Sequence, residues 1–272
     1  MTLRICLAGV TGWTGSAIAA AVLDSPEFEL VGAVARSAAG RTVAASIGGE
    51  AGSAVVIEPD VAAALRTPAD VLIDYTHPSA VKANVLLAIE EGLHAVIGTS
   101  GLTSQDYDDI DAAARRAGVG VVAAGNFSVT AALLKHFSGI AALHVPHWEI
   151  VDMAHAGKPD APSGTARELA DYLGDLAQNE PEVPVEETLG TPATRGATLG
   201  GAQVHSIRLP SYVISVEALF GLPGERLTIR HDAGSSAEPY VGGTLLAAKA
   251  ATSTTGLVRG LDTLLFGGAG AT

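Results

Sequence analysis

The densest group of chemically capable side chains lies between His155 and Thr165, where the sequence reads HAGKPDAPSGT. Lys158 can supply a positive charge and a proton, and His155 can donate a hydrogen bond or exchange a proton near neutral pH. Ser163, Gly164 and Thr165 are expected at a helix N-terminus, where hydroxyl and backbone N–H groups hold a carboxylate. This pattern predicts Lys158 and His155 as catalytic residues beside a substrate-binding helix end.

A structural explanation of the same segment competes with the catalytic one. Thr165 and Glu168 have the spacing of a capping box, and an apolar helix face follows at Leu169, Leu173 and Leu176. A well-capped helix that leaves Lys158 and His155 in solvent explains these residues about as well.

A second group of candidate residues is a glycine-rich turn between an apolar run, Leu3–Ala8, and a helical pattern. Glycines at such a turn permit tight bending, close approach of a pyrophosphate and close packing of strand and helix. The helix N-terminus then offers N–H groups and a partial positive charge to phosphates. The predicted cofactor-binding residues of the turn are Gly9, Thr11, Gly12, Trp13, Thr14 and Gly15. An ordinary strand-to-helix turn is the alternative.

The end of the second apolar run indicates which dinucleotide would bind. An acidic residue there favours NAD through its ribose hydroxyl, but this chain has Ala35 followed by Arg36 and Ser37. A guanidinium and a hydroxyl suit a 2′-phosphate, and Arg41 could assist. The residues therefore predict NADPH, with NADH possible but less preferred. The alternative is a solvated surface arginine.

The elements that must position these groups follow two different patterns along the chain. Up to about residue 125, short apolar runs alternate with helical stretches, which predicts right-handed βαβ units and a parallel sheet. Longer strands follow and predict a mixed sheet, while 178–202 reads as a long exposed loop. Helices are expected at 104–116 with a Thr103–Asp106 capping box, and at 165–177, 240–251 and 256–265. The fold class is therefore α/β, with a Rossmann-type parallel sheet and a second α+β domain carrying an open mixed sheet.

Composition excludes several classes of function. The formal charge is −13 and no Lys/Arg run is present, so nucleic acid is not an expected partner. A single cysteine excludes a disulfide framework and cysteine-based zinc sites, and no metal is expected. No signal-peptide pattern and no membrane-length apolar run occur, so we expect a cytoplasmic protein without membrane contact.

Several motifs together resemble the 4-hydroxy-tetrahydrodipicolinate (dihydrodipicolinate) reductase family. The segment from Lys158 to Ala166 resembles the family's K-x-DAPSGTA motif. Matching segments occur in order along nearly the whole chain: Asp74–Pro78, Ile97–Gly101, Ala124–Ser128, Val204–Leu209 and Thr228–Asp232.

The resemblance implies a reductase that transfers hydride from NAD(P)H to a cyclic, imine-like dicarboxylate in lysine biosynthesis. It implies a homotetramer built through the open sheet. It also implies a dinucleotide-binding domain at 1–127 plus 240–272 and a substrate-binding and oligomerisation domain at 128–239. The further cofactor-binding residues that it indicates are Tyr75, Thr76, His77, Gly98, Thr99, Ser100, Ala124, Asn126 and Phe127.

The departures from the family pattern concentrate at the predicted site. Ala154 stands where the family has the histidine usually given the proton-donor role, and Ser236 where it usually has an arginine. Trp13 and His77 also occupy positions where the family often has arginine. A buried carboxylate without its charge partner is unfavourable, so a different substrate is a real alternative.

Three hypotheses follow from these residues. The first is NADPH-dependent reduction of the lysine-pathway intermediate. The second is a divergent imine or enoyl reductase acting on another small substrate. The third is a non-catalytic dinucleotide-binding sensor.

Overall fold

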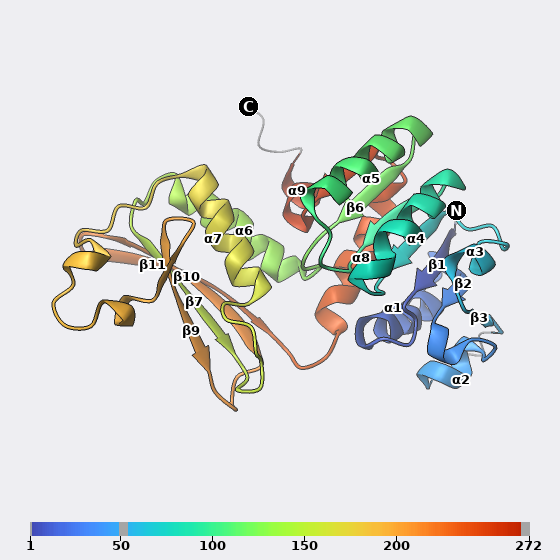
Figure 1. Ribbon diagram of the computed structural model, residues 1–272, viewed down its shortest axis with the longest axis horizontal. Coiled ribbons are helices and arrows are strands. Elements are labelled where there is room, and N and C mark those ends of the chain that lie inside the picture. Colours follow the sequence, from blue (N-terminus) through green and yellow to red (C-terminus); the bar gives the residue numbers. More distant parts are fainter. Residues whose placement is uncertain (1, 49–53, 268–272) are drawn as a thin grey trace. The chain divides into compact units, whose positions relative to one another are not determined.

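The computed structural model describes residues 2–48 and 54–267 of the 272-residue chain. The chain divides into two compact units (Figure 1). The first unit contains Met1–Val129 and Ala237–Thr272, and the second contains Thr130–Ser236. The chain therefore leaves the first unit once and returns to it.

A parallel sheet of seven strands forms the centre of the first unit. In order across the sheet, the strands are β12 (Gly256–Arg259), β6 (Gly120–Ala123), β5 (His94–Ile97), β4 (Val71–Asp74), β1 (Leu3–Ala8), β2 (Phe28–Val34) and β3 (Ile57–Glu58). Every pair of neighbours is parallel. The central β1, flanked by β2 on one side and β4 on the other, is the arrangement of a dinucleotide-binding sheet. The predicted Rossmann-type sheet is confirmed.

Helices pack in pairs against this sheet. The helical segments of the first unit are α1 (Trp13–Asp24), the 3₁₀ turn η1 (Arg36–Ala38), α2 (Val43–Ile47), α3 (Val61–Ala64), α4 (Pro78–Glu90), α5 (Ser104–Ala117), α8 (Glu238–Ala251) and α9 (Leu261–Phe266). Helix α1 packs beside α8, and α4 packs beside α5 (Figure 1). A buried apolar cluster between α4, α5 and the sheet includes Val85, Ile97, Ile110 and Val121. No helix within 2–48 and 54–267 has the length and apolar character needed to span a membrane.

Local sequence signals set several helix ends. Thr103 and Asp106 form the predicted capping box of α5, with each side chain bonded to the other residue's backbone N–H. Gly118 ends the same helix in the left-handed conformation. These caps confirm the predicted start and end of α5 within one residue.

The prediction of a helix from Gly256 to Leu265 is wrong. Residues Gly256–Arg259 form β12, which pairs with β6 and extends the sheet. Gly256 and Gly260, on either side of the apolar pair at 257–258, have φ values of 86° and 90°, which a helix cannot contain. Only Leu261–Phe266 is helical. Periodicity alone cannot separate a short strand from a helix in so brief an apolar run.

A mixed sheet of five strands forms the second unit, as predicted. Across the sheet, the strands are β11 (Glu225–Ala233), β10 (Ile214–Leu222), β7 (Trp148–Ala154), β9 (Ala202–Arg208) and β8 (Ala197–Leu199). Only β7 and β9 are parallel. Helices α6 (Val129–Ala142) and α7 (Gly164–Leu176) bury Leu134 and Leu169 against Ile150 and Phe220 on one face. The opposite face of the sheet carries charged side chains such as Glu149, Glu217 and Arg230.

The segment from 178 to 202 is largely exposed, as predicted. It contains two 3₁₀ turns, η2 (Val185–Glu187) and η3 (Pro192–Arg195). Its end forms β8, which pairs antiparallel with β9 and which sequence reasoning missed because only three residues are involved.

A close contact between α8 and the segment after β6, at Phe127, generates a stability prediction. A Cβ at Gly243 would lie 1.9 Å from the carbonyl oxygen of Phe127, whereas a Cβ at Gly242 would meet nothing within 4 Å. Gly243→Ala should therefore lower the free energy of unfolding by about 1–3 kcal/mol through overpacking. Gly242→Ala should raise it by up to about 1 kcal/mol because alanine favours the helix. Urea unfolding of both variants tests this, and equal effects at the two positions would contradict the packing argument.

Candidate active site

The carboxyl edge of the parallel sheet gathers the predicted cofactor-binding segments. Five segments each follow the end of a strand: Gly9–Gly15 after β1, Arg36–Ser37 after β2, Tyr75–His77 after β4, Gly98–Ser100 after β5 and Ala124–Phe127 after β6. Because these strands are parallel, their carboxyl ends share one edge, where open α/β sheets bind ligands. The structure therefore brings the segments together, and their roles there stay predictions.

The glycine turn is built by direct contact between backbones. Gly9 has a φ of 89°, and a Cβ on it would lie 2.2 Å from the carbonyl oxygen of Tyr75. A Cβ on Gly15 would lie 2.0 Å from the carbonyl oxygen of Gly9. Gly12 occupies the N-cap of α1, and no side chain within residues 2–48 and 54–267 caps this helix end. The first N–H groups of α1 are thus left for an anion, which fits a pyrophosphate.

A buried carboxylate holds two of the predicted loops in place. Asp74, at the end of β4, is fully buried. Its Oδ1 accepts hydrogen bonds from Thr76 N–H (3.0 Å), Thr76 Oγ1 (2.7 Å) and Thr99 Oγ1 (2.7 Å). Its Oδ2 accepts from Asn84 Nδ2 at 2.8 Å. The hydroxyls of Thr76 and Thr99 therefore fix the loops after β4 and β5, and sequence reasoning missed the role of Asp74 as their acceptor.

Tyr75 fills the space beneath the loop after β5. A Cβ on Gly98 would lie 2.1 Å from the Tyr75 ring, so only glycine allows this packing. The Tyr75 hydroxyl lies 2.7 Å from Thr244 Oγ1 of α8, and its ring is tilted against Phe127 at 6.2 Å between centroids. Burial raises the pKa of Tyr75, which keeps its hydroxyl protonated. Tyr75 and the buried Phe127 thus pack under the loops at the carboxyl edge of the parallel sheet.

Other predicted cofactor residues remain at the surface. Arg36 and Ser37 are exposed in η1, and Ser100 is exposed after β5. Trp13 is 59% exposed and meets Tyr240 edge-on, with ring centroids 5.8 Å apart. The surface location leaves these side chains accessible to a ligand.

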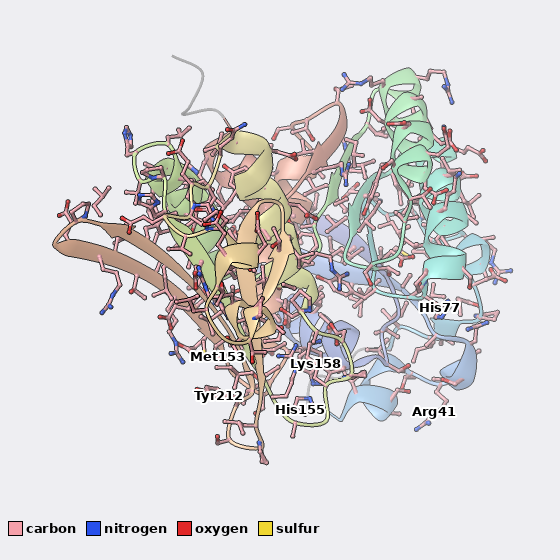
Figure 2. All side chains as sticks on the ribbon, turned by 60° about the vertical axis from the view of Figure 1, so that its left-hand side comes forward. Arg41, His77, Met153, His155, Lys158 and Tyr212 are labelled. Atoms are coloured by element: carbon pink, nitrogen blue, oxygen red, sulfur yellow. The ribbon has the colours of Figure 1, made fainter. Side chains whose placement is uncertain are left out.

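Two of the basic candidates already have contacts within the protein. The Nδ1 of His77 accepts a hydrogen bond from Ser79 N–H at 3.2 Å and caps α4. The Arg41 guanidinium donates to the carbonyl oxygen of Ala45 at 3.2 Å. Figure 2 labels both side chains.

The predicted catalytic residues of the second unit lie on the loop between β7 and α7 (Figure 2). His155 is exposed, and its Nδ1 accepts a hydrogen bond from Gly157 N–H at 3.1 Å. Lys158 is only 22% exposed, and its Nζ lies 2.8 Å from Oδ1 of Asp160. This ammonium lowers the pKa of the Asp160 carboxyl. Asp160 therefore pairs with the positive charge of Lys158 in this structure.

The prediction that Thr165 caps α7 is wrong by two residues. Ser163 is the N-cap, and its Oγ accepts a hydrogen bond from Ala166 N–H at 3.3 Å. Serine at this position satisfies the Ala166 N–H without the glutamate of a capping box, so the Thr165–Glu168 spacing does not mark the cap. Ser163 is buried, whereas Gly164 is exposed at the first turn.

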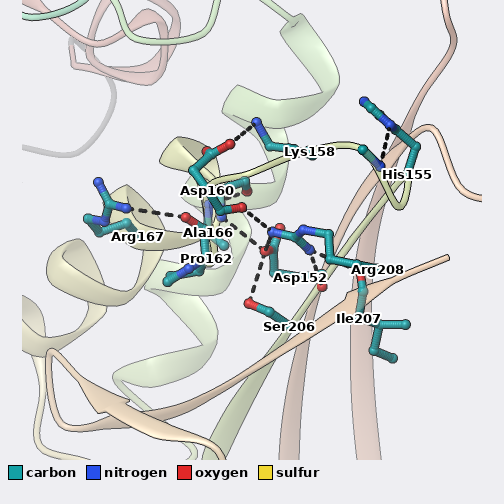
Figure 3. Close-up of polar contacts among 12 residues, drawn as sticks. Asp152, His155, Lys158, Asp160, Pro162, Ala166, Arg167, Ser206, Ile207 and Arg208 are labelled. Atoms are coloured by element: carbon teal, nitrogen blue, oxygen red, sulfur yellow. Dashed lines mark hydrogen bonds and ion pairs between the residues drawn. The ribbon is translucent and has the colours of Figure 1, made fainter.

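A buried ion pair beneath this loop was missed by sequence reasoning (Figure 3). Asp152 on β7 is fully buried, and its Oδ2 lies 2.7 Å from Nη2 of Arg208 on β9. Burial raises the pKa of Asp152, but hydrogen bonds from Arg208 and Ser163 outweigh burial and hold the pKa below its usual value. The carboxylate is therefore charged at neutral pH. The sequence signal was weak, because β7 also carries Glu149 and β9 also carries Gln203, His205 and Ser206.

The two departing positions of the second unit, Ala154 and Ser236, supply no positive charge. Ala154 is fully buried at the end of β7, and its carbonyl oxygen accepts a hydrogen bond from Leu209 N–H at 3.1 Å. Ser236 is exposed. Arg230, the nearest arginine before it in the sequence, lies 2.7 Å from Asp232 and 3.4 Å from Glu217. In the described ranges, no group of three or more His, Cys, Asp and Glu side chains is arranged to hold a metal ion.

Solved structures share the fold of this chain. A dihydrodipicolinate reductase from Paenisporosarcina sp. TG-14, with dipicolinate bound, is 28% identical with a TM-score of 0.87 and covers 97% of this chain and 100% of that one. An amine dehydrogenase from Mycobacterium smegmatis shares the fold at 15% identity, with a TM-score of 0.65 and coverage of 96% of both chains. The class is that of pyridine-nucleotide-dependent reductases.

Sequence comparison then gives the family. Residues 3–127 match the family described as dihydrodipicolinate reductase, N-terminus, and residues 127–265 match dihydrodipicolinate reductase, C-terminus. The 4-hydroxy-tetrahydrodipicolinate reductase of Moorella thermoacetica is 37% identical over 265 residues, which are 97% of this chain and 98% of that protein. That of Enterococcus faecalis is 34% identical over 263 residues, 97% of this chain and 100% of that protein. The chain belongs to the dihydrodipicolinate reductase family of lysine biosynthesis, and the predicted family is confirmed.

The network around Asp74 generates a prediction about the first unit. Asp74→Asn replaces an acceptor by a donor among buried donors, so we expect the free energy of unfolding to fall by about 1–3 kcal/mol. Asp60→Asn is the matched control, because Asp60 is the exposed N-cap of α3 and asparagine caps equally well. Urea unfolding should show a change below about 0.5 kcal/mol for the control. A similarly small change for Asp74→Asn would show that the network does not hold this edge.

Proposed function

We propose that the protein is an NADPH-dependent 4-hydroxy-tetrahydrodipicolinate reductase. In this proposal the first unit binds the nucleotide and the second unit binds the substrate and forms the homotetramer. The observation that carries the proposal is the loop from His155 to Gly164, which presents Lys158 and the start of α7 to a ligand. Membership of the reductase family supplies the reaction class.

The glycine turn and the residues after β2 support NADPH as the cofactor. The bound nucleotide would supply a hydride from its nicotinamide ring. The N-terminus of α1, without a side-chain cap, would hold the pyrophosphate. Arg36 and Ser37 are exposed where a 2′-phosphate would lie, and Ala35 offers no carboxylate to repel it. NADH would bind less well because it lacks the phosphate that Arg36 pairs with.

The loop after β7 supports a carboxylate substrate. Lys158 would exchange Asp160 for a substrate carboxylate, and the N–H groups at Gly164 and Thr165 would receive the same group. The substrate accepts hydride at a carbon of its C=N or conjugated C=C bond and a proton at the other end of the reacting system. Lys158 or the exposed His155 would supply that proton. Dipicolinate, bound in the Paenisporosarcina structure, is a planar dicarboxylate of the size such a loop would receive.

A second candidate function rests on the buried Ala154 and the exposed Ser236. A substrate with two carboxylates needs two sources of positive charge, and neither position supplies one. Arg230 is already paired with two carboxylates. These observations favour reduction of a different small imine or conjugated alkene. A dinucleotide-binding sensor without turnover is the outcome if no substrate is reduced.

The central test is NADPH oxidation with the lysine-pathway intermediate generated in situ by its synthase. We expect saturable turnover by the wild type. Lys158→Met should lower kcat/KM by about 100-fold, because a general acid and a carboxylate contact are both lost. Lys249→Met, a control in the first unit, should leave the rate unchanged. Turnover of other cyclic imines without turnover of this intermediate would establish the second candidate instead.

Cofactor choice is tested separately at Arg36. Arg36→Ala should lower kcat/KM with NADPH by about 10- to 100-fold, as expected for loss of one charged hydrogen-bonded pair, and leave NADH little changed. Arg116→Ala removes the same charge from the exposed end of α5 and serves as the control. The measurement is the ratio of kcat/KM for the two nucleotides. An unchanged ratio in Arg36→Ala would remove the assignment of NADPH recognition to this residue.

A further inference from the structure

A pair of charges lies beneath the substrate loop and contacts two of its residues, Asp160 and Ser163. Asp152 points to the face of the sheet that α6 and α7 cover, and Arg208 lies on the neighbouring strand β9. Asp152 is fully buried, and the Arg208 side chain is 16% exposed. Burial of charge is unfavourable unless the charge is paired and hydrogen-bonded. The pair therefore needs an explanation beyond packing.

The contacts of the pair fix both ends of the segment that opens α7 (Figure 3). Asp152 Oδ2 accepts hydrogen bonds from Ser163 N–H at 2.9 Å and from Ser206 Oγ at 3.1 Å. Nη2 of Arg208 donates to Asp152 Oδ2 at 2.7 Å and also to the carbonyl oxygen of Asp160 at 2.7 Å. Asp160 pairs with Lys158, and Ser163 caps α7. Residues 160 and 163 are thus tied to one buried charge centre.

The pairing is incomplete in a way that stability alone does not explain. Asp152 Oδ1 and Arg208 Nε are buried and have no hydrogen-bond partner among the described residues of the protein. A bidentate arginine–carboxylate contact would satisfy both atoms. Apolar residues of similar volume often stabilise a fold as well as a buried ion pair does, and a half-satisfied pair is worse. The observed geometry instead directs the arginine toward the loop carbonyl of Asp160.

We propose that Asp152 and Arg208 are positioning residues that set the place of Lys158 relative to the N-terminus of α7. Lys158 and the N-terminus of α7 must reach the same carboxylate, so a small displacement of residues 160–163 would move one away from the other. Ser163 N–H is committed to Asp152 and is not offered to the ligand, which leaves the exposed start of α7 at Gly164 for binding. The inference rests on the proposed function only for the identity of the ligand.

The test compares Asp152→Asn, Arg208→Met and the double variant carrying both substitutions. The probes are pyridine-2,6-dicarboxylate, titrated calorimetrically, and amide hydrogen exchange of residues 156–166. Each single variant should bind the dicarboxylate at least 10-fold more weakly and exchange faster in this segment. The double variant, without an unpaired buried charge, should recover the thermal midpoint of the wild type but not the affinity or the protection. Arg208→Lys should restore part of the affinity and part of the exchange protection. Arg226 is an exposed arginine on β11, and Arg226→Met should match the wild type.

The outcomes separate this inference from the proposed function. A double variant that recovers affinity and protection together with stability would show that the pair serves folding alone, and would overturn the inference. If the wild type does not bind the dicarboxylate, the proposed function fails. The exchange data then decide the inference, since faster exchange at 156–166 in a stable double variant supports it and unchanged exchange overturns it.

Discussion

A buried carboxylate must be surrounded by hydrogen-bond donors, and this requirement shapes both candidate ligand-binding regions. Asp74 in the first unit and Asp152 in the second are fully buried near the carboxyl ends of central strands. Each draws a backbone N–H from the loop that follows its strand, Thr76 for Asp74 and Ser163 for Asp152. The loops that carry the candidate chemistry are therefore held by buried carboxyl groups, while Arg36 and Gly164 remain exposed.

This arrangement reconciles an acidic protein with anionic ligands. The formal charge of −13 repels phosphates and carboxylates at long range. In the proposed function, the positive potential that meets the ligands would come from three groups: the start of α1, exposed Arg36, and Lys158 with the start of α7. Because these sources are few, the absence of a cation at Ala154 and Ser236 weighs on substrate choice more than it would in a basic protein. Recognition depends on how accurately the loops place each group.

The sequence predicted the two sheets and most helices better than it predicted the buried residues that hold the site loops in place. Alternation of apolar runs and helical stretches, together with the Thr103–Asp106 cap, was enough for both sheets and for α5. The short strands β8 and β12 were not predicted, because runs of three and four residues carry too little periodicity. Ser163 was overlooked as the cap because hydroxyl residues at neighbouring positions satisfy similar local rules. The Asp152–Arg208 pair joins residues far apart in the chain, and only the strand register of β7 and β9 brings them together.

Hydride transfer itself is the central claim, and isotope transfer tests it most directly. The protein would be incubated with NADPH carrying deuterium at both C4 positions of the nicotinamide and with the synthase-generated intermediate, and the product analysed by mass spectrometry. The account predicts a product one mass unit heavier than that formed with ordinary NADPH, in amounts that match the nucleotide oxidised. Oxidation of NADPH without deuterium in the product, or no oxidation of NADPH at all, would contradict the assignment of this chain as a reductase of that intermediate.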